Sequence, residues 1–133
     1  MEVEQLAPLT FLEPLTADQR GRLASRCRLA QYRRGERIIA EGETGDDWFG
    51  LLSGWVRVTR GSILLGKLGP GRFFGEMALL GDGTRNASVD ADSDCVCAVL
   101  GRRDFLNLIE EAPAVAEQVR AVVSARQRQP APR

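Results

Sequence analysis

The first thirty residues carry the hydrophobic pattern of one helix. Thr16-Ala17-Asp18-Gln19 has the form of a capping box, in which the threonine accepts from an early helix amide and the glutamine reaches back. Leu23 and Cys27 continue an apolar stripe at helical spacing. We therefore expect a helix from about Ala17 to Arg28. The apolar residues expected to pack ahead of it are Phe11, Leu12 and Leu15.

The middle of the chain has the texture of short strands between tight turns. Trp55-Val56-Arg57-Val58-Thr59 alternates, with the valines on one face and the polar side chains on the other. Cys95 to Leu100 is a continuous apolar run that indicates a buried final strand. Short strands at regular spacing are typical of a small antiparallel β-barrel or jelly roll. The glycines that punctuate the first part of this region are Gly35, Gly42, Gly45, Gly50, Gly54, Gly61 and Gly66.

Helical spacing returns after residue 101. Phe105, Leu108 and Ile109 form one short apolar face, and Pro113 suits the first turn of a further helix. A second stripe at helical spacing is formed by Val115, Val119, Val122 and Val123. We expect Pro130 to stop this helix and the tail from Gln127 onward to be disordered.

These patterns together predict an α+β fold, a small antiparallel β-barrel (jelly roll) with an N-terminal helix and two C-terminal helices. We expect residues 1–133 to form a single domain. Its helical start lies at about 8–30, its barrel at about 31–100 and its closing helices at about 102–128.

Charge and composition narrow the function. The 18 basic and 18 acidic side chains cancel, which argues against general binding to nucleic acid or to a membrane surface. No apolar run approaches the roughly 18 residues that a transmembrane helix needs, and the acidic start lacks the basic region of a signal peptide. We expect a cytoplasmic protein. The odd number of cysteines, Cys27, Cys95 and Cys97, argues against a disulfide framework in a chain without export signals, and Cys95 and Cys97 are expected to pack in the core.

The chain contains no histidine. This removes histidine-activated nucleophiles and most zinc sites, and no close pair of acids has the form of a general acid and base. We therefore expect a protein that is not an enzyme and that uses no metal and no cofactor.

Candidate chemistry lies in residues 72–89, RFFGEMALLGDGTRNASV. Phe74 and Gly75 precede a short run, residues 76–80, that is competent to form a helix. The free amides at a helix start, next to a glycine that permits close approach, form an anion site. Gly81-Asp82-Gly83 then turns the chain, so that Arg85 reaches the same spot with a planar fork suited to phosphate.

Glu76 has a different role in this interpretation. Its carboxylate would be repelled by a phosphate, but it accepts a hydrogen bond from a sugar hydroxyl. One arginine together with helix amides matches a ligand with a single negative charge. The motif therefore fits a phosphorylated ribose that has a free hydroxyl.

Phe74-Gly75-Glu76-Met77-Ala78-Leu79, followed by Arg85-Asn86-Ala87-Ser88-Val89, resembles the phosphate-binding cassette of the cyclic-nucleotide-binding domain family. That family includes the bacterial catabolite activator, protein kinase A regulatory subunits and the tails of cyclic-nucleotide-gated channels. The resemblance implies that Glu76 takes the ribose 2′-hydroxyl and that Arg85 takes the cyclic phosphate. It also implies phosphate contacts from the amides of Gly75, Met77 and Ala78. We refer to residues 74–89 as the cassette.

The resemblance leaves the choice of purine open. Asn86 follows the arginine, where guanine-preferring members tend to carry a hydroxyl residue, and its amide both donates and accepts. We expect cAMP to bind at least as well as cGMP.

A lid over the base is expected from the last helix, whose valine stripe has little else to pack against once the barrel is closed. Val122 and Arg126 are the contacts we favour, with Val119 and Val123 as further candidates. The pattern does not identify which helix face turns to the ligand.

The sequence therefore predicts a non-enzymatic sensor of cAMP or cGMP, whose ligand repositions the last helix to control an effector outside these residues. The alternative is the sensor part of a DNA-binding regulator resembling the catabolite activator. A sugar-modifying barrel enzyme would need metal ligands or acid-base pairs that are missing from the sequence. The effector partner and the oligomeric state are left open, and we expect no direct contact with nucleic acid.

Overall fold

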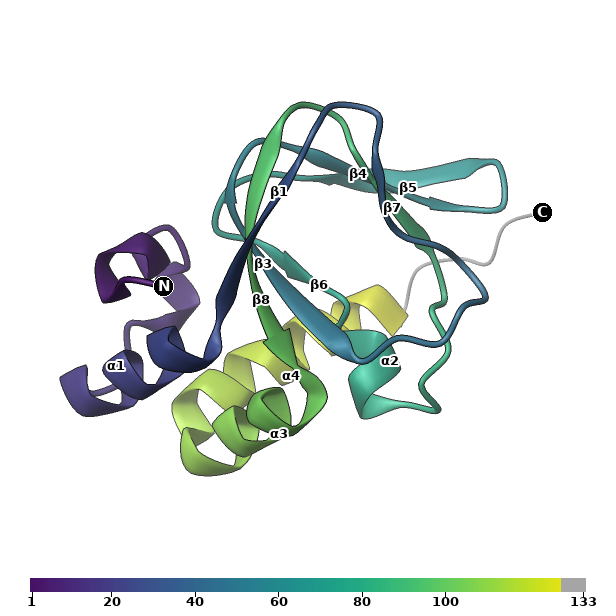
Figure 1. Ribbon diagram of the computed structural model, residues 1–133. Helices are drawn as coiled ribbons and strands as arrows, with labels where there is room; N and C mark the ends of the chain where they lie inside the picture. Colours follow the sequence, from purple (N-terminus) through teal and green to yellow (C-terminus); the bar gives the residue numbers. More distant parts are fainter. Residues whose placement is uncertain (128–133) are drawn as a thin grey trace.

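The computed structural model describes residues 1–127, in which two four-stranded antiparallel sheets face each other. The first sheet has the order β1 (Arg28–Tyr32), β8 (Cys95–Gly101), β3 (Asp47–Ser53) and β6 (Phe73–Phe74). The second has the order β2 (Arg37–Ile39), β7 (Ser88–Ala91), β4 (Val56–Arg60) and β5 (Ile63–Leu68). The strands close into a ring (Figure 1), so the predicted jelly roll is confirmed.

Helices flank this barrel at both ends of the chain. Two 3-10 turns, η1 (Val3–Leu6) and η2 (Thr10–Leu12), precede α1 (Ala17–Arg26). The chain closes with α3 (Arg102–Glu111) and α4 (Pro113–Gln127), while α2 (Glu76–Leu80) lies between β6 and β7. In Figure 1, α3 and α4 lie below the barrel, and α2 lies beside the end of α4.

The predicted capping box of α1 is present. The Gln19 amide donates to Thr16 Oγ1 at 3.1 Å, and the Thr16 amide donates to the glutamine side chain at 2.9 Å. The helix ends at Arg26 rather than Arg28, because Cys27 takes an extended conformation and Arg28 pairs with Val99 in β1. The barrel therefore begins at residue 28, three residues earlier than expected.

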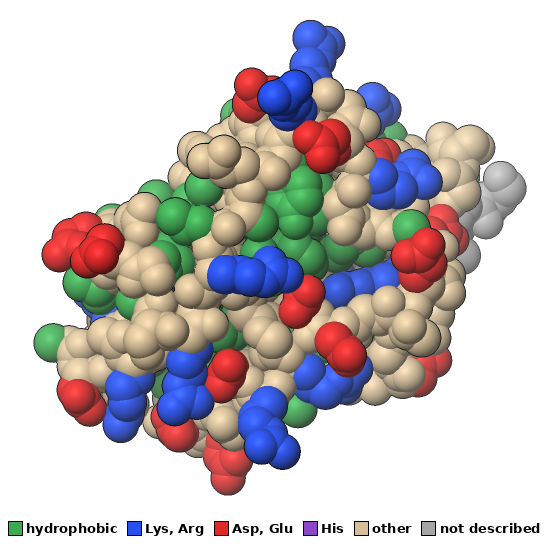
Figure 2. Space-filling view, in the orientation of Figure 1, with side chains coloured by type: hydrophobic (Ala, Val, Ile, Leu, Met, Phe, Trp, Pro, Cys, Tyr) green, Lys and Arg blue, Asp and Glu red, His purple; other side chains and the backbone are tan. Residues whose placement is uncertain are grey.

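Buried side chains form two clusters on opposite faces of β8. Ala98 and Leu100 belong to the cluster beneath the helices, which we call the helical core. Cys97 and Val99 belong to the cluster inside the ring of strands, which we call the barrel core. In Figure 2, hydrophobic side chains are visible at the centre of the face where Figure 1 shows that ring.

The cysteine prediction is confirmed, since all three thiols are free and buried. Burial raises the pKa of Cys27 to about 11 and that of Cys97 to about 12. Cys95 and Cys97 share one face of β8 and lie in the barrel core, as expected for a strand.

The expectation that the valines of α4 have little to pack against is wrong. Val115 and Val119 are 0% and 1% exposed and belong to the helical core, where α4 meets α3 and η2. Val122 and Val123 are partly buried at the edge of the same cluster. The expected stop at Pro130 and most of the expected disordered tail lie outside the described residues. Within residues 1–127, no helix is both long and apolar enough to cross a membrane.

Candidate functional site

A cavity of about 510 Å³ lies between the inner faces of the strands and the end of α4. Cassette, β5 and α4 side chains line it together. Ten of the twelve residues that the sequence singled out line this cavity: Phe74, Gly75, Glu76, Met77, Ala78, Arg85, Asn86, Ala87, Val122 and Arg126.

Gly75 occupies a position that only glycine fills without strain. It precedes α2 with a φ of +93°, and a Cβ there would lie 2.9 Å from the Asp47 carbonyl oxygen. No side chain caps the helix that follows. The amides at the start of α2 are therefore open to a group that enters the cavity.

Arg85 is held beside Gly75 by neutral acceptors. Its Nη1 donates to the Gly75 carbonyl at 2.8 Å, and its Nη2 donates to the Asp47 carbonyl at 2.9 Å. The residue is only 8% exposed, and this burial lowers the pKa of the guanidinium. The acids Asp47 and Glu76 oppose that shift, and the group stays charged at neutral pH. A buried positive charge with only carbonyl acceptors favours an anion at this point.

Glu76 is fully buried, and one of its two carboxylate oxygens has a hydrogen-bond partner. Its Oε1 accepts from Arg126 Nη1, whereas its Oε2 has no hydrogen-bond partner among residues 1–127. A buried carboxylate oxygen without a donor is energetically costly. The cavity therefore has a place for a donor, such as a hydroxyl group, next to Glu76.

Arg126 ties the end of α4 to the cassette. Besides its contact with Glu76, its Nη2 donates to the Phe73 carbonyl, and its guanidinium lies 5.3 Å from the centre of the Phe73 ring. Sequence reasoning named Arg126 as a lid residue but missed its pairing with Glu76. No spacing rule connects two charges that are fifty residues apart.

The cavity-facing side of α4 differs in part from the expected one. Val122 and Arg126 line the cavity, together with Ala121 and Ala125, which sequence reasoning missed. Val119 and Val123 do not line it, since the valine stripe packs toward the helical core. The two alanines lie on the helix face next to that stripe, and the helical spacing from Val122 and Arg126 would have predicted them.

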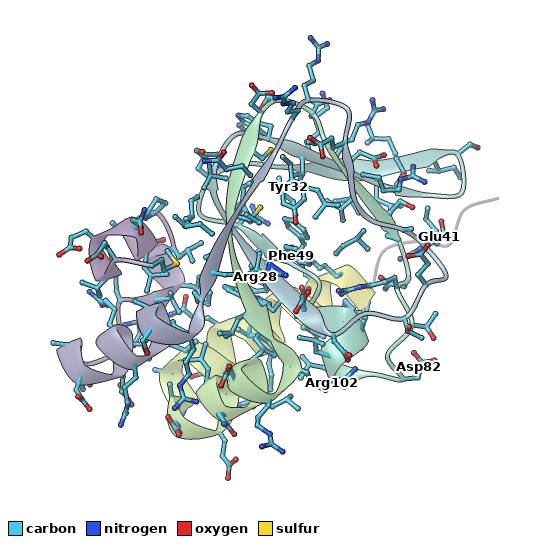
Figure 3. All side chains as sticks on the ribbon, viewed as in Figure 1. Arg28, Tyr32, Glu41, Phe49, Asp82 and Arg102 are labelled. Atoms are coloured by element: carbon cyan, nitrogen blue, oxygen red, sulfur yellow. The ribbon has the colours of Figure 1, made fainter. Side chains whose placement is uncertain are left out.

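Further contacts position the cassette from outside the cavity. Arg102 at the start of α3 donates to the carbonyls of Leu79 and Gly45 at 3.5 and 3.4 Å. Figure 3 shows Arg102 beside α2, and Asp82 in the loop that follows α2. Asp82 Oδ1 accepts from the Thr84 amide at 2.9 Å, so the interpretation of Asp82 as a turn residue is confirmed.

The aromatic floor of the cavity is stacked. Phe74 lies parallel to Phe49, with ring centroids 5.0 Å apart, and Figure 3 shows Phe49 inside the barrel. Among residues 1–127, no group of three or more potential metal ligands is present. The polar groups around the cavity thus suit binding of an anionic, hydroxyl-bearing ligand.

Comparisons with known proteins identify the family of this domain. The family model described as "Cyclic nucleotide-binding domain" matches residues 29–112. A cAMP-dependent protein kinase regulatory subunit of Debaryomyces hansenii is 36% identical over 111 residues, which cover 83% of this chain and 24% of that protein. Glutaminase 1 of Bradyrhizobium diazoefficiens is also 36% identical, over 89% of this chain and 19% of that protein.

A solved structure gives the same picture. The regulatory domain of Toxoplasma gondii PKA, co-crystallised with cAMP, has a TM-score of 0.82 and 28% identity to this chain. The likeness covers 92% of this chain and 48% of that one. The chain spans about a quarter or less of the length of the two curated relatives, the regulatory subunit and the glutaminase. Since the family match alone extends over more than half of its residues, the chain belongs to the cyclic nucleotide-binding domain family.

Proposed function

We propose that this chain is a non-enzymatic sensor that binds cAMP or cGMP in the cavity beneath α4 and transmits binding through that helix. One observation carries the proposal. Among residues 1–127, buried Arg85 lacks a carboxylate partner at hydrogen-bond distance and buried Glu76 has an unpartnered oxygen, and both line the same cavity. A cyclic nucleotide supplies the anion and the hydroxyl that these two groups need.

The phosphate belongs at the cassette helix. Arg85 supplies the positive charge, and the amides of Gly75, Met77 and Ala78 supply donors at the start of α2. The left-handed backbone of Gly75 allows a phosphate oxygen to approach closely. A single arginine matches the single charge of a cyclic phosphodiester better than the two charges of an open monophosphate.

The ribose belongs at Glu76. In this arrangement the 2′-hydroxyl donates to Oε2 while Oε1 keeps its contact with Arg126. The ribose then completes the hydrogen bonding of a buried carboxylate, which strengthens a charge-assisted bond. The same carboxylate contacts ligand and α4, so occupancy of the site is communicated to the helix.

The base fits between β5 and α4. The cavity wall there is mostly apolar and includes Leu65 and Leu68 from the barrel and Ala121, Val122 and Ala125 from the helix. Such a slot holds a flat purine by burying its faces. A lid that contacts the base only in the bound state shifts a two-state equilibrium by the difference in affinity between the two states.

The effector lies outside this proposal. The two curated relatives carry different names, a kinase regulatory subunit and a glutaminase, although the matched region is about the same size in each. The same kind of domain therefore accompanies different outputs.

The alternative of a DNA-binding regulator predicts that the full gene encodes two further amphipathic helices with a basic recognition face. Sequencing the gene tests this alternative. A cytoplasmic location stays a prediction from the sequence.

Calorimetry with cAMP, cGMP, AMP and 2′-deoxy-cAMP tests the proposal. We expect at least one of the two cyclic nucleotides to bind, AMP to bind much more weakly, and loss of the 2′-hydroxyl to reduce affinity. Absence of binding by both cyclic nucleotides to a folded protein would refute the proposal. Equal binding of AMP would show that the cyclic phosphate is not what the cassette recognises.

A further inference from the structure

The lining of the cavity contains five basic side chains but only one acidic side chain, Glu76. Four of the basic residues have partners. Arg85 donates to two carbonyls, Arg126 contacts Glu76, Arg60 donates to the Asn86 carbonyl at 2.9 Å, and Lys67 pairs with Asp92 at 2.9 Å. The fifth, Arg72, makes no side-chain hydrogen bond or ion pair within residues 1–127. Its five N–H donors are uncommitted.

Arg72 lines the cavity and has an exposed side chain. It belongs to the turn between β5 and β6, where its amide donates to the Gly69 carbonyl at 3.2 Å and its carbonyl accepts from Leu51 at 2.8 Å. The next residue, Phe73, packs in the helical core, and Phe74 lines the cavity. Strand alternation places Arg72 on the same face as Phe74.

The residues around Arg72 indicate where its side chain lies. The Phe73 carbonyl accepts from Arg126 of α4, so the exposed Arg72 side chain lies at the rim where β5, β6 and the end of α4 meet. Leu68, Val122 and Ala125 give that end an apolar wall. Arg72 is thus the uncommitted polar side chain next to the slot for the base.

We propose that Arg72 reads the edge of the base and makes the site prefer guanine. The inference rests on the proposed function, since it concerns the same cavity. A guanidinium only donates. Guanine presents two adjacent acceptors, O6 and N7, which a guanidinium fork binds in a bidentate manner, whereas adenine presents a donor amine beside N7.

This inference opposes the expectation that cAMP binds at least as well as cGMP. That expectation rested on Asn86, which follows the phosphate-binding arginine and whose carbonyl is held by Arg60. Asn86 is thus held next to Arg85 within the cassette, whereas Arg72 reaches the cavity from the turn before β6. Base choice belongs to Arg72 in this arrangement.

Titrations of cGMP, cAMP and cIMP against four proteins test the proposal. The proteins are the native chain, Arg72→Met, Arg72→Lys and the control Arg57→Met, which removes an equal charge from the exposed side of β4. We expect the native chain to bind cGMP about fivefold or more tightly than cAMP, the lower end of the range for one bidentate arginine–guanine pair. The base of cIMP has O6 and N7 but no 2-amino group, so cIMP should bind like cGMP.

Arg72→Met should abolish the preference for cGMP while leaving cAMP affinity within about twofold, and Arg72→Lys should retain only part of it. Arg57→Met should keep the native ratio. A purely electrostatic role is distinguishable, because cAMP and cGMP carry the same charge and their ratio would not move. An unchanged ratio in Arg72→Met, or cIMP binding like cAMP, would overturn the inference. Either result leaves the sensor proposal standing, whereas absence of binding by every cyclic nucleotide refutes the sensor itself.

Discussion

Gly45 leaves the space that the Arg85 side chain occupies. A Cβ at position 45 would lie 1.9 Å from Arg85 Nε and 2.2 Å from its guanidinium carbon. The obstructed atoms belong to a long side chain rather than to the backbone, so the arginine can move aside while the fold survives. The position of the Arg85 guanidinium therefore depends on glycine at position 45, which has no side chain to occupy that space.

Gly45→Ala should weaken binding of cyclic nucleotide at least tenfold while changing the unfolding temperature little. The displaced guanidinium loses its position beside Gly75, which is the expected cause. Calorimetry and thermal unfolding measure the two effects. Gly21→Ala is the matched control, because nothing lies within 4 Å of a Cβ at that helical position. Native affinity in Gly45→Ala would show that Arg85 binds from another position.

Arg85→Ala should weaken cyclic-nucleotide binding by about 2 to 5 kcal/mol, the usual effect of leaving a buried charge without its partner. The protein should still fold, since the groups that lose their partner are two uncharged backbone carbonyls, those of Gly75 and Asp47. Calorimetry on a variant with a normal unfolding transition is the measurement. Unchanged affinity would remove Arg85 from the site.

Glu76→Ala should weaken binding by roughly 1.5 to 3 kcal/mol, the range for a hydrogen bond to a charged group. It should also erase the discrimination between cAMP and its 2′-deoxy analogue, because the proposed acceptor of the 2′-hydroxyl is gone. Titrating both nucleotides against both proteins measures this. A variant that still discriminates would show that another residue reads the ribose.

At the residue scale, sequence reasoning reached the cassette but not its internal contacts. Gly75 and Arg85 stand in a local motif whose chemistry is legible from the spacing. Two contacts join segments that lie far apart in the chain. One is the hydrogen bond between Glu76 and Arg126, and the other is the packing of the Arg85 side chain against Gly45. Only the tertiary structure brings such pairs together.

At the element scale, α4 has two faces that pack differently, one in the helical core and one along the cavity. Val115 and Val119 anchor it in the helical core, whereas Val122 and Arg126 turn toward the cavity. We expect the part anchored in the core to stay in place when ligand binds, because Val115 and Val119 are already buried. We expect the response to ligand in the final two turns.

Amide hydrogen exchange should show this division. Cyclic nucleotide should slow exchange across residues 75–87 and 121–127, while the segment 113–119 should change little because the core already protects it. Arg126→Met should keep the slowing in the cassette and reduce it in 121–127. Slowing confined to the cassette would show that α4 is not the lid.

The predicted elements with strong periodicity are present, and so is the short helix expected at residues 76–80, whereas the shortest strands were not predicted. The helices α1 and α3 and the strands β4 and β8 were placed within a few residues. The strands β2 and β6, of three and two residues, are too short for any period and exist because a neighbour pairs with them. Likewise, α1 ends early because pairing in β1 takes over at Arg28.

At the scale of the whole molecule, buried thiols make stability depend on pH. Burial raises the pKa of Cys97 from 9.0 to about 12 and that of Cys27 to about 11. An unfolded chain therefore loses these protons at lower pH than the folded chain does. Their contribution is complete below about pH 9 and is lost as the pH rises toward the folded values.

Urea unfolding under reducing conditions should accordingly show lower stability at pH 10.5 than at pH 8, two conditions chosen on either side of the ordinary thiol pKa of about 9. Cys97→Ala should start from lower stability, because the thiol fills the barrel core, but should lose less between the two conditions. An equal loss in both proteins would assign the pH dependence to other groups.

The class of the fold was predictable, but its division into two cores was not. Alternation along β4 and the apolar run of β8 indicate a barrel. Nothing in either pattern shows that β8 is covered on both faces, by helices on one side and by strands on the other. That residues 1–133 form one domain stays a prediction.

The double burial of β8 also bears on how such a protein diversifies. Ala98 and Leu100 face the helices, while Cys97 and Val99 face the barrel, so one strand separates two sets of packing constraints. Within the described residues, the helical layer reaches the cassette through Leu79, which belongs to the helical core, and through Arg102 and Arg126. Descendants of this chain that keep these two arginines and the packing of Leu79 should therefore tolerate new side chains on the outer surface of the helices without a change in the cassette.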